Sequence, residues 1–145
     1  MSNPSLSFPI LSTRPLAIVR LPRRSLRPLC LPVAASESAQ REGLSKRTSL
    51  SADEGMVFTF PACERVQFTL AQTRVPLDVI FCRTRCALDG DTVVVDVRSV
   101  ATVAALDPRP VDPREPVDVV IELAAGAAEA AGIVPGAELW ICACG

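Results

Sequence analysis

The chain has 145 residues, the length of one ordinary domain, and a formal net charge of −1. It contains no histidine, no tyrosine and a single lysine, Lys46. Because histidine is the usual general base near neutral pH, this composition excludes Ser-His-Asp and Cys-His nucleophilic sites and zinc sites with histidine ligands. We therefore predict that the protein is not an enzyme. No apolar stretch reaches the roughly 20 residues that a membrane-spanning helix needs.

The near-neutral total conceals two parts of opposite charge. Residues 1–51 hold eight basic and two acidic side chains, whereas the remainder holds seven arginines and fourteen acids. This asymmetry predicts a basic arm joined to an acidic folded domain. We place a basic disordered extension at residues 1–36, a polar linker at residues 37–55 and the folded domain at residues 56–145.

The extension is rich in serine, arginine and proline and has no acidic residue before Glu37. This composition is typical of an organellar transit peptide, and its prolines, which break helices, favour a plastid address over a mitochondrial one. A disordered basic arm with no address function has the same composition. Both interpretations stay open, so a plastid localisation is expected only if residues 1–36 are a transit peptide.

The folded part alternates apolar and polar residues with the period of two that indicates β-strands. Strands are expected at residues 66–71, 77–84, 92–98, 117–123 and 137–144. Gly90 predicts a hairpin turn between the second and third strands, and the alanine-rich stretch 124–132 predicts one short helix that ends at Gly132. The predicted fold is mainly β, a small five-stranded OB-like barrel, because closing the sheet removes its two edges.

The strand expected at residues 117–123 has one apolar and one mixed face. Val119 and Ile121 alternate with Asp118 and Glu122. We expect the two acids to lie on the face in contact with water, where they would contribute to solubility.

Candidate partner-binding residues lie in a proline-rich loop and in the last strand. Four prolines within residues 107–116 prevent both helix and ladder formation, so this segment is either an extended ligand for an aromatic groove or a rigid spacer. We select Arg109 and Arg114 from this loop, together with Trp140, the only tryptophan. For Trp140 the alternative is packing in the core at one end of the barrel.

Four of the six cysteines have spacings that suggest a metal site: Cys82, Cys86, Cys142 and Cys144. On extended strands the first pair would be roughly 13 Å apart and the second roughly 7 Å, which is too far for one ion or a disulfide. We predict that the cysteines pack as small apolar side chains, with no metal and no cofactor. Metal binding, a disulfide and redox sensing are the alternatives.

The end of the sequence resembles a known fold family. Val117-Asp-Val-Val-Ile-Glu, followed by Gly132-Ile-Val-Pro-Gly-Ala-Glu-Leu-Trp, is similar to the closing hairpin of OB-fold barrels. Residues 117–144 are most similar to one barrel of the largest subunit of the telomere-capping CST complex. The resemblance implies a place in a single-stranded-DNA-binding assembly and a nuclear localisation.

The sequence thus predicts a non-enzymatic binding or assembly module. Because the folded part is acidic and poor in aromatic residues, we expect it to dock a protein partner within a nucleic-acid-handling complex, with weak or indirect contact to nucleic acid. The alternative is a plastid-targeted barrel that binds a small ligand or metal through its cysteines. The oligomeric state is left open.

Overall fold

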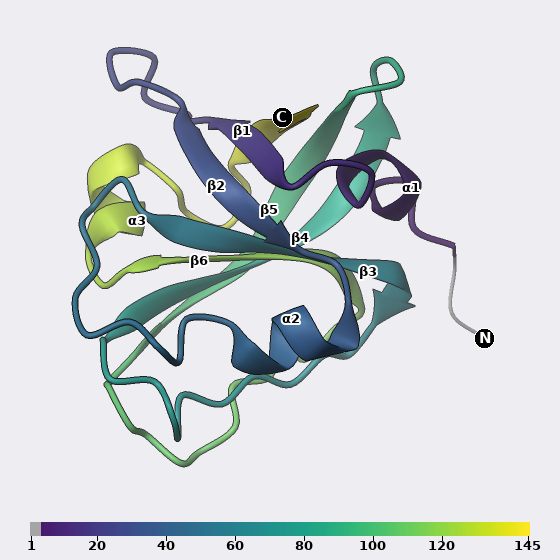
Figure 1. The fold of residues 1–145 in the computed structure, drawn as a ribbon. Coiled ribbons are helices and arrows are strands. Elements are labelled where there is room, and N and C mark those ends of the chain that lie inside the picture. Colours follow the sequence, from purple (N-terminus) through teal and green to yellow (C-terminus); the bar gives the residue numbers. More distant parts are fainter. Residues whose placement is uncertain (1–3) are drawn as a thin grey trace.

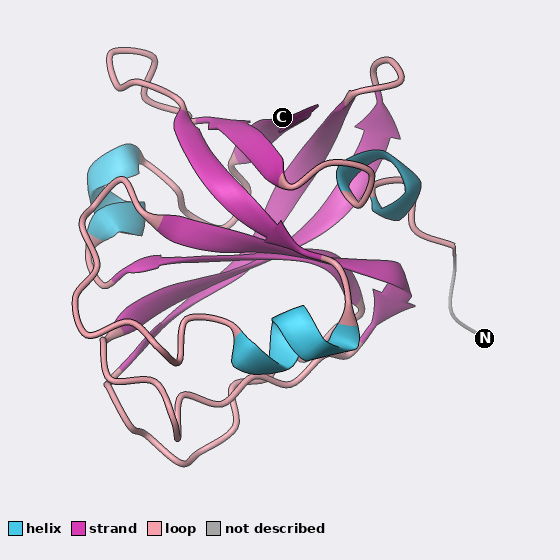
Figure 2. Cartoon of the chain, in the orientation of Figure 1, coloured by secondary structure: helices cyan, strands magenta, loops and turns pink. Residues whose placement is uncertain are grey.

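Seven strands close into one β-barrel in the computed structural model, which describes residues 4–145 (Figure 1). Three short helices lie outside it (Figure 2). The elements in chain order are α1 (Phe8–Leu11), β1 (Leu16–Arg20), β2 (Leu29–Ala34), α2 (Glu37–Glu42), β3 (Gly55–Glu64), β4 (Leu77–Ala87), β5 (Thr92–Val103), β6 (Val117–Ala124), α3 (Ala127–Ala131) and β7 (Glu138–Cys144).

Around the barrel the strands follow the order β1-β2-β3-β6-β4-β5-β7, and β7 pairs with β1 to complete the ring. Neighbouring strands are antiparallel except β2 and β3, which are parallel. None of the helices within residues 4–145 has the length and hydropathy of a membrane-spanning helix.

The mainly β class and the barrel are confirmed, but the number of strands is wrong. The strands expected from residue 77 onward correspond to β4, β5, β6 and β7. The predicted short helix is α3, and it ends at Gly132, whose φ of 77° lies in the left-handed region that glycine adopts without strain.

The strand predicted at residues 66–71 is a loop. Val66 and Leu70 are buried there, and Phe68 exchanges two backbone hydrogen bonds with Val111 of the loop between β5 and β6. The alternation of apolar residues therefore reflects a loop that packs onto the barrel, rather than a strand within it. The first strand after the predicted linker is instead β3, which begins at the last residue of that linker.

The larger correction concerns the N-terminal segment. β1 and β2 lie within residues 1–36, which were expected to be disordered, and Ala17 and Leu31 are fully buried in the barrel core. The apolar runs of these strands supply enough buried surface to order them despite the surrounding arginines and prolines. Cleavage of a transit peptide near residue 36 would remove two of the seven strands, so the barrel argues against that interpretation.

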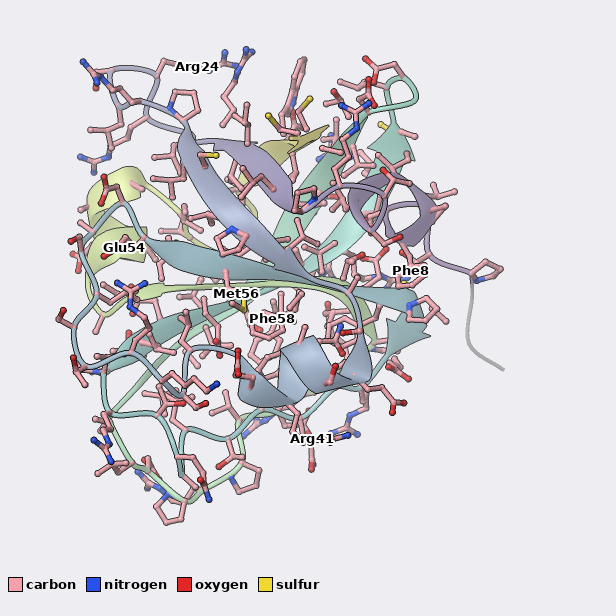
Figure 3. The ribbon with its side chains drawn as sticks, viewed as in Figure 1. Phe8, Arg24, Arg41, Glu54, Met56 and Phe58 are labelled. Atoms are coloured by element: carbon pink, nitrogen blue, oxygen red, sulfur yellow. The ribbon has the colours of Figure 1, made fainter. Side chains whose placement is uncertain are left out.

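The barrel has apolar side chains on both sides of its wall. Its interior is one cluster, and a second cluster, which we call the outer core, lies on the outside of β3, β6 and β4. Phe58 and Phe81 are the largest fully buried side chains of the outer core, and Figure 3 shows Met56 and Phe58 on β3 next to α2. The helix α2 and the flanking loops cover this face and exclude water from it.

Asp118 is buried, contrary to the prediction that it faces water. Its carboxylate accepts hydrogen bonds from Ser5 Oγ at 2.9 Å, from Ser7 Oγ at 3.3 Å and from the backbone N–H of Thr84 at 2.8 Å. Three donors compensate for the loss of hydration, so this acid anchors the segment before α1 to the barrel wall.

The burial of Leu31 allows a direct test of the structured N-terminal segment. We expect Leu31→Ala to lower the free energy of unfolding by about 2–5 kcal/mol, because it removes a fully buried side chain from the barrel core. Chemical denaturation followed by circular dichroism measures this. Leu6→Ala, at a side chain that is half exposed, should change stability by less than about 0.5 kcal/mol. Equal, negligible effects of both substitutions would contradict the assignment of β2.

Candidate functional site

One side of the barrel keeps many of its outward-facing side chains partly or fully exposed. It is formed by the outer surfaces of β2, β1, β7 and β5, and the strand register sets the side chains on it in rows. Ile18 lies between Cys30 and Cys142 in one row, and Arg20 lies beside Trp140 in the next. We call this surface the Trp140 face and define it by these five residues.

Trp140 is the largest side chain of this face, with 36% of its surface exposed. The guanidinium carbon of Arg20 lies 5.7 Å from the centre of the indole ring, within the range of a cation–π interaction. The prediction of a partner-binding position remains open for Trp140, whereas its alternative, packing in the core, does not hold.

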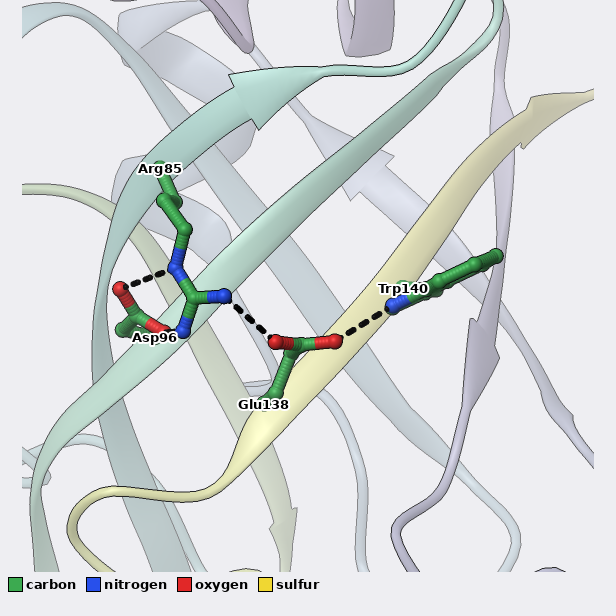
Figure 4. Close-up of polar contacts among 4 residues, drawn as sticks. All are labelled: Arg85, Asp96, Glu138 and Trp140. Carbon is green, nitrogen blue, oxygen red and sulfur yellow. Dashed lines mark hydrogen bonds and ion pairs between the residues drawn. The ribbon is translucent and has the colours of Figure 1, made fainter.

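A chain of polar contacts holds the Nε1 edge of the Trp140 indole (Figure 4). The Nε1–H of Trp140 donates to Glu138 Oε1 at 2.8 Å, and Arg85 bridges Glu138, at 2.6 Å, and Asp96. The hydrogen bond from Trp140 and the contact with Arg85 lower the pKa of Glu138. These contacts limit the rotamers of the indole, so a partner would meet a preorganised ring.

Two hollows flank the ring, and both are lined by Trp140 and Arg20. The larger, of about 300 Å³, also includes Ile18, Leu88 and Cys142, and the smaller, of about 120 Å³, includes Arg24. An exposed aromatic side chain between two hollows is typical of a surface on which a partner inserts its own side chains.

The loop between β1 and β2 makes the surroundings of this face positive. Arg23, Arg24 and Arg27 of this loop are exposed, and Figure 3 shows Arg24 where the loop projects from the body of the protein. The ion pairs within residues 4–145 include none of these arginines, nor Arg20.

Three of the acids near this face already have cationic partners, whereas Asp89, which lines the larger hollow, accepts hydrogen bonds from the backbone N–H groups of Asp91 and Thr92. Asp91 pairs with Arg14 at 3.6 Å, and Asp96 and Glu138 share Arg85. The unpaired charges of the region are therefore mainly positive, although the second part of the chain is acidic in total.

The structure does not bring the three predicted partner-binding residues together. Arg109 forms an ion pair with Asp107 at 2.7 Å, and it lies with Arg114 in the loop between β5 and β6. Figure 1 places this loop at the opposite end of the molecule from the loop between β1 and β2. Trp140 instead lies beside Arg20, which the sequence analysis missed because it assigned β1 to a disordered extension. The short apolar run of residues 16–19 is the signal that could have revealed this strand.

The cysteine candidates are also separated. Cys82 is buried inside the barrel, where desolvation raises the pKa of its thiol well above the usual range, whereas Cys86 is only partly buried. Cys142 and Cys144 lie on the outer surface of β7, and all six cysteines are free thiols. Within the described part of the chain no three histidine, cysteine or acidic side chains are grouped as metal ligands.

Glu122 is the second acid that the sequence analysis wrongly placed in water. It is only 4% exposed, and its strand register sets it between Met56 and Val79 on the outer-core side of β6. No donor within residues 4–145 forms a hydrogen bond with its carboxyl group, and burial raises its pKa to about 7. Loops and α2 cover this side of the sheet. The polar positions of the alternating pattern in β6 are therefore buried, although the pattern alone predicted that they face water.

The buried carboxyl group predicts an unusual dependence of stability on pH. A raised pKa means that the folded state holds the proton more tightly than the unfolded state, so the contribution of Glu122 to stability is greatest below about pH 4.5 and is lost as the pH rises through about 7. The loss attributable to Glu122 is on the order of 3 kcal/mol.

We expect Glu122→Gln, which keeps the shape and removes the charge, to be more stable than the unsubstituted protein at pH 8.5 and to show a flatter profile between pH 5.5 and 8.5. Urea denaturation across this range provides the measurement. Glu129→Gln, at an exposed position of α3, is the matched control and should leave the profile unchanged. An identical slope in the Glu122→Gln variant would contradict this account.

Comparison with known proteins identifies the fold family. The model of the DUF192 family, described as "Uncharacterized ACR", matches residues 19–141. The crystal structure of a protein from Sinorhizobium meliloti, described as a candidate transcription regulator, is 30% identical over 86% of this chain and 92% of its own, with a TM-score of 0.72. A protein of unknown function from Novosphingobium aromaticivorans is 28% identical over 86% of this chain and 82% of its own, with a TM-score of 0.66. The comparison with curated proteins gave no match.

These findings overturn the resemblance to OB-fold barrels and to the CST subunit. The similarity rested on the hairpin of residues 117–144, but the family match extends from β1 to β7 and therefore takes in nearly the whole barrel. A Pro-Gly turn before a final strand is a local feature that many β-proteins share, and the nuclear localisation inferred from it is withdrawn with it. The chain belongs to the DUF192 family.

Proposed function

We propose that the protein is a non-enzymatic binding module that docks an acidic protein segment on the Trp140 face. The observation that carries this proposal is the position of Trp140, exposed and preorganised, on the more exposed side of the barrel beside arginines that have no acidic partner. Tryptophan and arginine are the residues most enriched among the hot spots of protein interfaces.

The composition of the face favours a peptide over a single-stranded nucleic acid. Nucleic-acid grooves stack successive bases on several aromatic side chains. Trp140 is the only exposed aromatic side chain of the described residues, whereas Ile18, Leu88 and Cys142 provide apolar contact area around it. A segment that alternates acidic and apolar side chains would complement both the hollows and the arginines.

The description of the Sinorhizobium meliloti protein suggests a role in transcription for that relative. If this chain has a related role, its partner could be DNA or a protein of the same apparatus. An oligonucleotide is therefore the second probe in the experiment below.

The sole tryptophan makes binding measurable by its own fluorescence. We expect a 12-residue peptide that alternates glutamate and leucine to change the Trp140 emission, and the same peptide with lysine in place of glutamate to bind at least tenfold more weakly. Arg20→Gln should weaken binding of the acidic peptide about fivefold, the size expected of a partly exposed charge contact. Trp140→Ala, followed by anisotropy of a labelled peptide, should weaken it on the order of 30-fold.

Arg109→Gln is the control, because this residue lies at the other end of the protein and is paired with Asp107. It should bind the peptide as the unsubstituted protein does. Equal binding of acidic and basic peptides, or tighter binding of a 12-nucleotide oligo-dT than of the acidic peptide, would contradict the proposal.

A further inference from the structure

A separate hollow lies at one mouth of the barrel, under the loop between β1 and β2. Its volume is about 390 Å³, within the range of pockets that bind small molecules. We call it the mouth cavity and define it by the six side chains that the argument uses: Leu26, Arg27, Leu29, Asp53, Leu123 and Ala130.

The floor of the mouth cavity is the interior of the barrel itself. Leu29 and Leu123 line the cavity and also belong to the buried barrel core. A ligand seated there would therefore touch core side chains without passing between strands. The mouths of β-barrels are among the preferred positions of small-molecule sites.

Three hydrogen bonds hold the walls in place. The buried carboxylate of Asp78 accepts hydrogen bonds from the backbone N–H groups of Gly126 and Ala128, each at 3.0 Å, and thereby fixes the start of α3. The backbone N–H of Arg23 donates to the carbonyl of Ala131 at 3.4 Å, which joins the β1–β2 loop to the end of the same helix. The cavity is thus built from anchored elements on two sides.

The charges at the rim of the mouth cavity indicate which head group a ligand bound there would carry. Arg27 lines the cavity, is exposed, and has no ion-pair partner within residues 4–145. Arg23 and Arg24 of the same loop add two further positive charges, against one negative charge from Asp53. Most of the other lining side chains are leucine, alanine or proline.

We propose that the mouth cavity is a binding site for a small amphipathic carboxylate, with its apolar body against Leu29 and Leu123 and its carboxylate on the guanidinium of Arg27. A planar guanidinium can bind both oxygens of a carboxylate at once. This site is distinct from the Trp140 face and does not depend on the function proposed for that face.

Octanoate is the test ligand, with octanol and octylamine as probes that share its apolar chain but differ in head group. Calorimetry on the full chain should show the order octanoate, octanol, octylamine from tightest to weakest. Arg27→Gln should weaken octanoate binding about fivefold and leave octanol unchanged. Arg109→Gln, which changes an arginine at the other end of the protein, should leave octanoate binding within twofold.

A second pair of variants locates the bound chain. Ala130→Leu would fill the cavity from an exposed position of α3, so it should weaken both octanoate and octanol at least fivefold without unfolding the protein. Ala125→Leu, an equal change at an exposed residue outside the cavity, should have no effect on binding. Equal affinity for the three probes, unchanged octanoate binding in both Arg27→Gln and Ala130→Leu, or no binding at millimolar concentration would overturn the proposal.

Discussion

The pairing of β1 with both β2 and β7 is the constraint on which the rest of this structure depends. Without β1 the sheet would be open, and the edges of β2 and β7 would expose unpaired backbone groups. The same pairing carries a basic, arginine-rich segment onto an otherwise acidic domain. It sets Arg20 beside Trp140 and positions the β1–β2 loop over the mouth of the barrel, so both proposed binding surfaces exist only in the closed barrel.

Closure also divides the outside of the barrel into two unlike surfaces. The surface of β3, β6 and β4 is covered and carries an apolar outer core, whereas the surface around Trp140 is partly exposed. Two buried acids lie on the covered side. Asp118 is compensated by three donors, but Glu122 has none and keeps its proton up to about pH 7. A neutral Glu122 is compatible with apolar neighbours, so the outer core tolerates it near neutral pH at a cost in stability that grows as the pH rises.

The sequence predicted the strands whose alternation is not interrupted, namely β4 to β7, and the glycine that ends α3. It failed where composition and structure conflict. Arginines and prolines between β1 and β2 suggested disorder, although the apolar runs on either side of them are buried. Alternation at residues 66–71 suggested a strand, although it belongs to a loop that packs onto the sheet. A pattern of period two reports which side chains are buried, and it does not say whether a neighbouring strand or a covering loop buries them.

The candidate surfaces were predictable only in part, because they depend on contacts between distant segments. Trp140 was selected as a partner-binding residue, but its neighbour Arg20 is 120 positions away in the chain and could be found only through the register of β1 and β7. Arg109 was selected from a loop in which it pairs locally with Asp107. The mouth cavity joins the β1–β2 loop to α3, so no local motif could have indicated it.

Native-state hydrogen exchange tests the central claim, that β1 closes the barrel, most directly. The backbone amides of Ala17, Val19 and Leu31 should exchange as slowly as those of Ile141 in β7, because all four are buried in one closed ring of strands. Exchange of the first three amides at the rate of an unstructured peptide, with Ile141 still protected, would show that the N-terminal segment does not belong to the barrel.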